Sequence, residues 1–457
     1  MGKYFGTDGF RGEAGTTLTA ERAYKIGRFL GWYYSKNGTK KVKAVIGKDT
    51  RRSSYMLEYA IVAGLTASGA DAYMLHVTTT PSVSYATACD DFDCGIMISA
   101  SHNPFYDNGI KLVNSRGEKM DDGTIQKIES YLDGNVAAFG FNNDLPLAKG
   151  AALGEIVDFA AGRNRYIGYL ISLSRHSFKG LRIGLDCANG SAWMIAKSVF
   201  DALGARTYPI NTEPNGLNIN DNAGSTHIDV LCRYVRENGL DMGFAFDGDA
   251  DRCIAVDEKG DVVNGDHILY ILATLLKKEN ALTNNTVVTT VMSNLGLYRA
   301  LDEAGIAYVQ TKVGDRFVYE NMLQTGNCIG GEQSGHIILS KYATTGDGIL
   351  TAIKLTEAVL ESKQSLQKLA SPVVMLPQVL KNVRVTDKTA VRNHRLVQEK
   401  VEELSKRLGK MGRILLRESG TEPVVRVMVE ATTLTECENY AQEIVDEIYA
   451  CRLAEME

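Results

Sequence analysis

Residues 242–252 read MGFAFDGDADR, a short apolar run that leads directly into three alternating aspartates. The run 242–246 has the length and composition of a buried strand, and Gly248 lets the chain turn tightly just after it. The aspartates would then lie in the loop at the carboxyl end of that strand. Because ligands of α/β sheets gather at the carboxyl ends of parallel strands, this stretch indicates both a fold class and a site.

The same arrangement of a strand followed by a polar loop occurs twice more. Residues 94–98 precede a loop at 99–104, and residues 327–329 precede a glycine-rich loop at 330–336. An earlier predicted strand begins each of the three repeats, at 43–47, 181–185 and 286–292. Amphipathic stretches between the strands predict helices, so we expect an α/β protein with a triplicated unit and mostly parallel strands.

The end of the chain differs from these repeats. Charged residues become dense from about Ser371, and a strand-like run at 424–430 is followed by an amphipathic helix from about Leu434. The prediction is therefore an α/β chain of three similar mixed α/β domains plus a small C-terminal α+β domain. Their expected boundaries are 1–155, 156–255, 256–370 and 371–457.

Composition excludes several classes of function. The 457 residues contain 50 Lys plus Arg and 55 Asp plus Glu, so the net charge of -5 lacks the basic excess of a nucleic-acid-binding protein. No run of about 18 apolar residues predicts a membrane span, and the N-terminus lacks the apolar core of a signal peptide. The eight cysteines form no C-x-x-C pair, which argues against zinc and dithiol redox sites. We expect a cytoplasmic enzyme with free thiols.

The spacing of Asp247, Asp249 and Asp251 suits a hard cation, and Mg²⁺ prefers a few carboxylates together with a phosphate oxygen. An EF-hand is excluded because Arg252 stands at the sixth position, where that motif requires glycine. The other interpretation of the spacing is a solvated acidic turn. A strand leading directly into the motif, and an arginine directly after it, favour the metal site.

The loop at 99–104 reads SASHNP. Ser101 could carry a phosphate, and its small neighbours predict an accessible Oγ. The plainer interpretation is a Ser/Asn cap on a turn. A serine hydrolase is disfavoured because G-x-S-x-G is absent and His102 has no evident partner.

The loop at 330–336 has P-loop glycine spacing, but His336 stands where a P-loop requires lysine. On an extended loop, Glu332, Ser334 and His336 would face one side and could bind the hydroxyls of a sugar. An ordinary glycine-rich turn is the alternative.

A fourth motif, RESGTEP at 417–423, offers guanidinium, hydroxyl and backbone donors of the kind that a phosphate dianion needs. Arg426 follows shortly after. A cap with a surface arginine would have the same composition.

These four loops, in this order, resemble the α-D-phosphohexomutase superfamily, and the resemblance covers nearly the whole chain. It also rests on FGTDGFRG at 5–12, on the residues from Ser101 to Lys111, and on KVGDR at 312–316. Gln333 and the pair Asp315–Arg316 make the chain most similar to the branch that acts on glucosamine phosphates. The branch that acts on glucose and mannose phosphates usually differs at these positions and remains the alternative.

The resemblance implies four domains around a central cleft and an intramolecular phosphotransferase that is phosphorylated on Ser101. It implies Mg²⁺ held by the phosphoserine and the three aspartates, a hexosamine phosphate as substrate, and glucosamine or glucose 1,6-bisphosphate as activator. It implies catalytic roles for Ser101, Lys111, Arg11 and His102. It implies substrate binding by Arg252, Lys312, Asp315, Arg316, Glu332, Gln333, Ser334, His336, Arg417, Ser419, Gly420, Thr421 and Arg426.

We expect a monomer or homodimer without nucleic-acid or membrane partners. A metal-dependent phosphatase and a non-catalytic sugar-phosphate sensor are the alternatives from other classes. A phosphatase needs a water in line with the phosphoserine, which no sequence feature requires, and a sensor has no need of a phosphorylatable serine.

Overall fold

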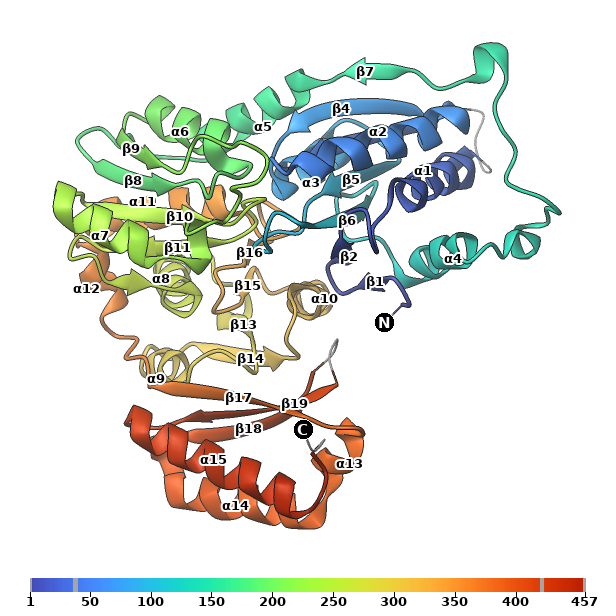
Figure 1. Cartoon of the computed structure of the whole chain (residues 1–457). Coiled ribbons are helices and arrows are strands. Elements are labelled where there is room, and N and C mark those ends of the chain that lie inside the picture. Colours follow the sequence, from blue (N-terminus) through green and yellow to red (C-terminus); the bar gives the residue numbers. More distant parts are fainter. Residues whose placement is uncertain (1, 36–39, 420–422, 455–457) are drawn as a thin grey trace. The chain divides into compact units, whose positions relative to one another are not determined.

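The computed structural model describes residues 2–35, 40–419 and 423–454 (Figure 1). The chain divides into two compact units, which we call the large unit and the small unit. The large unit comprises Met1–Met292 and Ile306–Ser371, and the small unit comprises Ser293–Gly305 and Pro372–Glu457.

The large unit contains three sheets. The first is formed by β1 (Phe5–Gly6), β2 (Gly9–Glu13), β3 (Lys43–Lys48), β4 (Asp71–Val77), β5 (Cys94–Ile98), β6 (Asp107–Asn114) and β7 (Ile156–Asp158). The second is formed by β8 (Arg182–Asp186), β9 (Arg206–Ile210), β10 (Met242–Phe246), β11 (Cys253–Val256) and β12 (Val262–Val263). The third is formed by β13 (Thr286–Thr290), β14 (Ala307–Thr311), β15 (Ile329–Gly331) and β16 (Ile337–Leu339).

The three sheets share one strand order. Neighbouring strands follow the sequences β4-β3-β5-β6, β9-β8-β10-β11 and β14-β13-β15-β16. In each sheet the first three of these strands are parallel and the fourth is antiparallel to its neighbour. The predicted triplicated α/β unit is thereby confirmed.

Helices cover the sheets of the large unit. They are α1 (Ala20–Ser35), α2 (Arg52–Ala67), α3 (Thr80–Cys89), α4 (Asp122–Leu132), α5 (Ala160–Ser172), α6 (Ala192–Ala202), α7 (Asp229–Asn238), α8 (Gly265–Lys278), α10 (Asp315–Thr325), α11 (Gly348–Ser362) and α12 (Leu366–Ala370). Short 3-10 turns lie at Val136–Phe139, Gly150–Ala152, Gly224–Thr226 and Thr283–Asn285.

Alternation along β5 shows how the first sheet is buried on both faces. Ile96 and Ile98 belong to a core cluster with Ile26 of α1 and Ile61 of α2. Met97 points to the opposite face, into a second cluster shared with α3. Successive strand side chains alternate between faces, so a central strand covered on both sides reads as a continuous apolar run.

The site loops occupy the same position in each repeat. Each lies where the third strand turns into its antiparallel fourth strand, at residues 99–106, 247–252 and 332–336. In the third repeat the strand begins later than predicted and includes Gly330 and Gly331. A Cβ on Gly330 would meet the side chains of α10 at about 2.8 Å, so the close packing of α10 requires glycine inside the strand.

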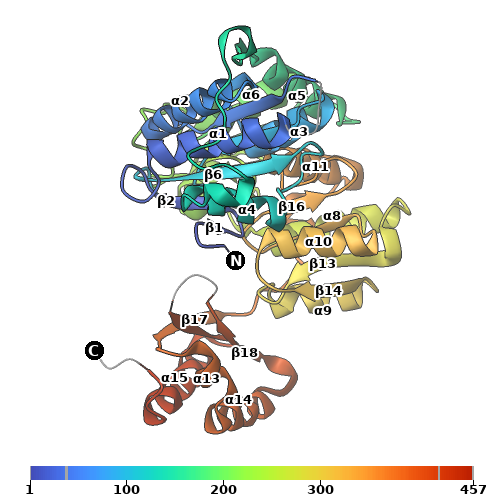
Figure 2. The ribbon, with the colours of Figure 1, turned by 90° about the vertical axis from the view of Figure 1, so that its right-hand side faces the viewer.

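The small unit is an antiparallel sheet covered by helices. Its strands are β17 (Gln378–Arg384), β18 (Arg413–Glu418) and β19 (Val424–Glu430), in the order β17-β19-β18. Its helices are α9 (Leu295–Glu303), α13 (Lys388–Asn393), α14 (Arg395–Leu408) and α15 (Leu434–Ala450), and a 3-10 turn lies at Gly409–Met411. Figure 2 shows α13, α14 and α15 on one face of the sheet, where they share its apolar core.

The helix α9 belongs to the small unit although its sequence lies between β13 and β14 of the large unit. The Asn294 side chain bonds both the amide and the carbonyl of Leu376 at 3.0 Å. The amide of Leu295 donates to the Glu430 carboxylate at 3.0 Å. These contacts tie α9 to the end of β19 and to the segment before β17.

Candidate functional site

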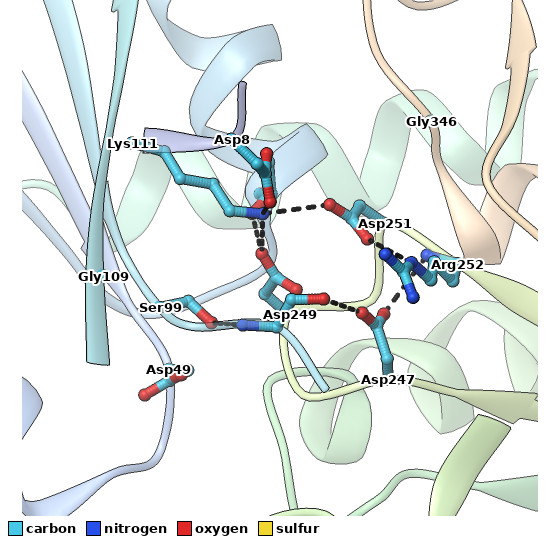
Figure 3. A network of polar contacts seen from close by, with 12 residues as sticks. Asp8, Asp49, Ser99, Gly109, Lys111, Asp247, Asp249, Asp251, Arg252 and Gly346 are labelled. Atoms are coloured by element: carbon cyan, nitrogen blue, oxygen red, sulfur yellow. Dashed lines mark hydrogen bonds and ion pairs between the residues drawn. The ribbon is translucent and has the colours of Figure 1, made fainter. Parts of the chain in front are cut away.

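The loop after β10 gathers its three carboxylates. One oxygen from each of Asp247, Asp249 and Asp251 lies within 4.8 Å of the others, and all three residues are buried. In Figure 3 the loop extends from the carboxyl end of its strand, points Asp249 and Asp251 toward Lys111, and places the Asp247 carboxylate near Arg252. The position at a strand end, predicted from the sequence, is the one observed.

A cation fits this cluster by two criteria. Within the described part of the chain, Oδ1 of Asp249 has no hydrogen-bond partner although it is buried. Burial, together with the charges of Asp251 and Asp249, raises the pKa of Asp247 to about 8. The Asp247 carboxyl therefore resists ionisation unless a cation is bound beside it, and all-oxygen donors select a hard cation.

Ser101 faces this cluster from the first repeat. Its hydroxyl donates to the carboxylate of Asp247, and its Oγ lies 3.4 Å from Nδ1 of His102. Burial, and next the Arg252 charge, lowers the pKa of His102 to about 4. The imidazole is therefore neutral at pH 7. Ser101 itself is 1% exposed, so the expectation of an accessible Oγ does not hold for this conformation.

Side chains distant in sequence hold the Ser101 loop. The Arg51 guanidinium donates to the carbonyl oxygens of Ser101 and Asn103 at 3.1 and 2.6 Å. Asn220 donates to the same two oxygens at 2.9 and 3.0 Å. The Ser99 hydroxyl accepts from the Ser101 amide at 2.9 Å. None of these three supporting residues was predicted as part of the site. Arg51 and Asn220 become neighbours of the loop only in the folded chain, whereas Ser99 lies in the loop itself, two residues before Ser101.

Lys111 links the first repeat to the carboxylate cluster. Its Nζ donates to Asp249 at 2.7 Å and to Asp251 at 3.0 Å, and lies 3.4 Å from Asp8 (Figure 3). Although burial opposes it, the charges of these carboxylates raise the pKa of Lys111 well above its usual value. The side chain is thus a fixed positive charge beside the cluster.

Arg11 and Arg252 add two further cations. The Arg11 guanidinium pairs with Asp8 and lies 3.4 Å from the side-chain oxygen of Asn103. The Arg252 amide donates to Asp247 at 3.2 Å, and its Nε lies 4.0 Å from Asp251. Burial lowers the pKa of Arg252, but the charges of Asp247 and Asp251 outweigh it and raise the pKa overall.

The third loop is a turn, contrary to the extended loop that would place its alternate side chains on one side. The amide of Gly335 donates to the carbonyl of Glu332 at 3.0 Å, which closes the turn. Ser334 is exposed, whereas His336 is buried and Glu332 and Gln333 are half-buried. The turn separates these side chains, so the expected common face is wrong.

His336 and Glu332 nevertheless lie at the site. The imidazole of His336 approaches Asp251 at 3.7 Å and Asp315 at 3.5 Å. Burial lowers its pKa, but the contact with Asp251 and the charge of Asp315 raise it to about 9. The amide of Gly346 also donates to Nε2 at 3.0 Å, a geometry that needs a neutral ring with its proton on Nδ1. Burial raises the pKa of the Glu332 carboxyl.

The KVGDR motif divides between the site and the surface. Asp315 accepts from Lys119 at 2.8 Å and faces His336. Arg316 forms a two-bond pair with Asp122 at 2.6 and 2.8 Å. Lys312 is exposed, with its ammonium 5.9 Å from the ring centre of Phe317. Of this motif, therefore, only Asp315 contacts the charged residues beside the three aspartates.

The predicted phosphate loop lies in the small unit. Arg417 and Arg426 face each other on β18 and β19, and burial followed by the Arg426 charge lowers the pKa of Arg417. Two facing guanidiniums suit an anion. Ser419 is buried at the end of β18. Gly420 and Thr421 lie outside the described residues.

A cavity of about 600 Å³ adjoins the charged residues of the large unit. Its lining includes Asp8, Lys111, Lys119, Asp251 and Arg316. Pockets of roughly 300–1,000 Å³ with a few convergent polar groups are typical of small-molecule sites. Separately, no helix within the described ranges is long and apolar enough to cross a membrane.

Two charged residues beside the three aspartates, Asp8 and Lys119, were not predicted from the sequence as part of the site. Asp8 lies in the two-residue turn between β1 and β2, and Lys119 follows β6. Asp8 belongs to the FGTDGFRG motif, a signal that could have identified it. Lys119 has no motif of its own, and its partner Asp315 is 196 positions away in the sequence.

Known protein families match this chain along most of its length. Family models described as phosphoglucomutase/phosphomannomutase match in four parts: alpha/beta/alpha domain I at residues 2–138, domain II at 164–260, domain III at 264–374 and the C-terminal domain at 380–447.

Curated relatives agree with the family models. A phosphoglucosamine mutase of Lachnospira eligens is 64% identical over 449 residues, which are 98% of each chain. A phosphoglucosamine mutase of Bacillus licheniformis is 48% identical over 450 residues, which are 98% of this chain and 99% of that protein.

A solved structure shares the fold at low identity. The crystal structure of Aspergillus fumigatus N-acetylphosphoglucosamine mutase in complex with GlcNAc-6P and magnesium aligns with a TM-score of 0.70. The alignment has 18% identity and covers 97% of this chain and 95% of that one.

Proposed function

Because this chain belongs to the phosphoglucomutase/phosphomannomutase family of α-D-phosphohexomutases, we propose that it interconverts glucosamine 6-phosphate and glucosamine 1-phosphate. The observation that carries the proposal is the hydrogen bond from Ser101 to Asp247, which joins a nucleophile to a buried cluster of three carboxylates. Lys111, bonded to the other two carboxylates, adds the positive charge that a transferring phosphoryl group requires.

The proposed cycle begins with a phosphate on Ser101. The P–Oγ bond breaks as the sugar O1 bonds to phosphorus, the O1 proton passes by way of a nearby base to Oγ, and the products are a 1,6-bisphosphate and the free Ser101 hydroxyl. After the sugar turns over, Oγ gives up its proton and attacks the phosphorus on O6. The P–O6 bond breaks, O6 takes up that proton, and glucosamine 1-phosphate departs as the phosphoserine is regenerated.

The charged residues have separate tasks in this cycle. Lys111 and Arg11 place positive charge beside the phosphorus in flight, and such fixed charges lower a barrier most where water is excluded. Arg252 orients the substrate from the other side of Asp247. His102, neutral at pH 7, can accept or return a proton near Oγ.

The metal would be Mg²⁺, held by Asp247, Asp249 and Asp251 together with an oxygen of the phosphoserine. When bound, it supplies the charge that neutralises the phosphoryl oxygens during transfer. The magnesium in the Aspergillus fumigatus relative supports this choice.

The substrate rests on two lines of support. Relatives at 48% and 64% identity are phosphoglucosamine mutases, and Gln333 and Asp315 match the pattern of that branch. Glu332 and His336 are proposed to bind ring hydroxyls, and the facing Arg417 and Arg426 to bind the phosphate that is not reacting. We place the reaction in the cytoplasm, with glucosamine or glucose 1,6-bisphosphate as activator.

The first test concerns the phosphoserine. Intact-mass analysis of the wild type should show one added phosphate, and Ser101→Ala should lack both this phosphate and turnover. Ser82→Ala, in α3, is the matched control, because it removes a buried hydroxyl that has no hydrogen-bond partner in the described chain and should retain the phosphate. Activity of Ser101→Ala within tenfold of the wild type would overturn the mechanism.

The second test concerns the substrate. The ratio kcat/KM is measured side by side for the 6-phosphates of glucosamine, glucose and mannose. We expect glucosamine 6-phosphate to be preferred, with measurable activity on the glucose analogue, because one polar contact is worth only about 0.5–1.5 kcal/mol. A tenfold preference for glucose or mannose phosphate would overturn the substrate and leave the mechanism standing.

A further inference from the structure

Six ionisable side chains beside the proposed site form a closed ring in which acids and bases alternate. Around the ring, the contacts are Asp8–Lys119 at 3.1 Å, Lys119–Asp315 at 2.7 Å, Asp315–His336 at 3.5 Å, His336–Asp251 at 3.7 Å, Asp251–Lys111 at 3.0 Å and Lys111–Asp8 at 3.4 Å. Part of the ring, from Lys111 to Asp8 and Asp251, is seen in Figure 3.

The ring joins segments from all three repeats of the large unit. Asp8, Lys111 and Lys119 come from the first repeat, Asp251 from the second, and Asp315 and His336 from the third. One of its members, Asp251, belongs to the carboxylate cluster, and Lys111 and His336 contact that cluster. Lys119 is the member that connects Asp8 to Asp315, and it touches none of the three clustered aspartates through any contact in the described chain.

We propose that Lys119 is a positioning residue for phosphoryl transfer, which acts through Asp8 and Asp315 to hold the cations of the first repeat in register with the third. This inference rests on the proposed function for the reaction concerned, but the contacts that support it do not depend on which sugar is bound. It assigns a role to a residue that matched no motif in the sequence.

The position of Asp8 explains how the effect would reach the reacting atoms. Asp8 contacts three cations, because it pairs with Arg11, lies 3.4 Å from Lys111 and accepts from Lys119 at 3.1 Å. If Lys119 loses its charge, Asp8 is shared by Arg11 and Lys111 alone and is drawn toward them. Both of these cations would then move relative to the phosphorus.

The residues around Lys119 keep its side chain charged and direct it toward both repeats. Its ammonium also donates to the Thr7 carbonyl at 3.1 Å, so its donors point to three oxygens on two repeats. Burial opposes the charged form, but Asp315 and Asp8 together raise the pKa of Lys119. The side chain lines the cavity of about 600 Å³ without being predicted to bind substrate.

A nearby ion pair supplies a matched control. Asp122 and Arg316 also join the first repeat to the third, with two bonds at 2.6 and 2.8 Å, and Arg316 directly follows Asp315 in sequence. This pair lies outside the ring. An effect caused merely by loosening the contact between the repeats should therefore appear equally in Asp122→Asn and in a variant of Lys119.

The experiment compares Lys119→Gln, Lys119→Arg and Asp122→Asn with the wild type, using whichever hexose 6-phosphate the wild type converts. We expect Lys119→Gln to lower kcat about 100-fold with KM changed less than about threefold, because small misplacements of catalytic groups cost about that much. Lys119→Arg should recover most of the loss, and Asp122→Asn should keep the wild-type kcat. In a Ser101→Ala background, Lys119→Gln should leave the Kd for glucosamine 6-phosphate within about threefold.

A double variant keeps the test decisive if Lys119→Gln folds poorly. Lys119→Gln with Asp315→Asn leaves no unpaired charge between these two positions, and it should fold and show the same loss of kcat. A kcat within threefold of the wild type in a folded Lys119→Gln or double variant, or an equal loss in Asp122→Asn, would overturn the proposal. A wild type without mutase activity on any hexose phosphate would instead overturn the proposed function.

Discussion

At the scale of single residues, two backbone angles in the site loops are unusual. Ser101 and Ala250 have φ values of 54° and 56°, in the left-handed region that residues with a side chain rarely occupy. Each such conformation costs roughly 1–2 kcal/mol, so it persists only where surrounding contacts fix it. For Ser101 those contacts are the bonds from Arg51 and Asn220 to its carbonyl oxygen. The strained backbone at Ser101 is therefore part of the conformation that places its Oγ against Asp247.

Replacing Ala250 by glycine tests this strain without removing a ligand. The gain from relieving φ, roughly 1–2 kcal/mol, offsets the lost methyl packing and the greater freedom of glycine in the unfolded chain. We expect Ala250→Gly to lie within about 0.5 kcal/mol of the wild type in urea unfolding. Ala245→Gly, in the extended strand β10, is the control and should cost about 1.5–2 kcal/mol. Equal losses in the two variants would mean that Ala250 is not strained.

The three aspartates permit a prediction about metal removal. Exhaustive chelation should abolish turnover, and Mg²⁺ should restore it better than softer cations, because the donors are all oxygen. Asp249→Asn should raise the Mg²⁺ concentration for half-maximal activity by more than about tenfold, since one of three charges is lost. Asp257→Asn, which alters a buried aspartate outside the cluster, should respond to Mg²⁺ as the wild type does. Activity that survives chelation unchanged would remove the metal from the mechanism.

At the scale of elements, the helix α11 begins on a buried acid. Asp347 accepts from the Leu350 amide at 2.9 Å as the cap of this helix, and from the Tyr166 hydroxyl at 2.7 Å. Burial nevertheless raises the pKa of Asp347 to about 6, from 3.8. Folding therefore takes up a proton, and the stability present below pH 3.8 is lost as the pH rises through 6.

Replacing Asp347, the cap of α11, should reveal the same dependence of stability on pH. Between pH 4 and pH 7.5, the stability of Asp347→Asn relative to the wild type should improve by up to about 3 kcal/mol, because the amide never ionises. Denaturant unfolding at several pH values measures this difference. Asp257→Asn is not a suitable reference for it, since burial also raises the pKa of Asp257, whereas Asn238→Ala carries no titrating group. A difference that falls with rising pH would contradict the assignment.

A second prediction at this scale concerns the strands β18 and β19. Like charges directly opposite on neighbouring strands destabilise a sheet, so the pairing of Arg417 with Arg426 is costly, and a bound anion would offset that cost. Arg417→Gln should raise KM for the sugar phosphate about tenfold while leaving the melting temperature equal or higher. Lys381→Gln, on β17 and facing Val427, should change neither quantity. A drop in melting temperature with unchanged KM would indicate a structural role for Arg417.

At the scale of the whole molecule, the chain passes between its two units three times, at residues 292–293, 305–306 and 371–372. The helix α9 is thus inserted into the third repeat while it packs with the small unit. Its first turn is fixed there by Asn294, which caps the Gly296 amide at 2.9 Å and bonds both polar groups of Leu376.

Cleavage at the last crossing tests this packing. With a protease site placed after Ser371, the fragment from Pro372 onward should still elute with the rest under native conditions. Asn294→Ala should weaken this association by about 30-fold or more, because it removes two buried hydrogen bonds and a cap. Asn238→Ala, at the end of α7, is the control with no expected effect. Equal association in the two variants would show that α9 does not hold the fragment.

Much of this organisation follows from the sequence. The apolar run before Asp247 and the repeated strand-to-loop pattern predicted three equivalent loops, because strand direction and burial depend on nearby residues. The partners of Asp8 and Lys119 could not be predicted, since their contacts depend on how three sheets pack. The burial of Ser101 was missed for the same reason, because Asp247, Arg51 and Asn220 cover it from distant segments.

The insertion of α9 has a consequence for how such a protein can change during evolution. A domain encoded by one continuous stretch of a gene can be lost, duplicated or exchanged in a single recombination event. The small unit is encoded by two stretches, with three strands of the third repeat, β14, β15 and β16, between them. A gene that recombined at residue 371 would carry away the sheet of the small unit but leave behind α9, the helix that is bonded to it. We therefore expect the small unit to be inherited together with the third repeat.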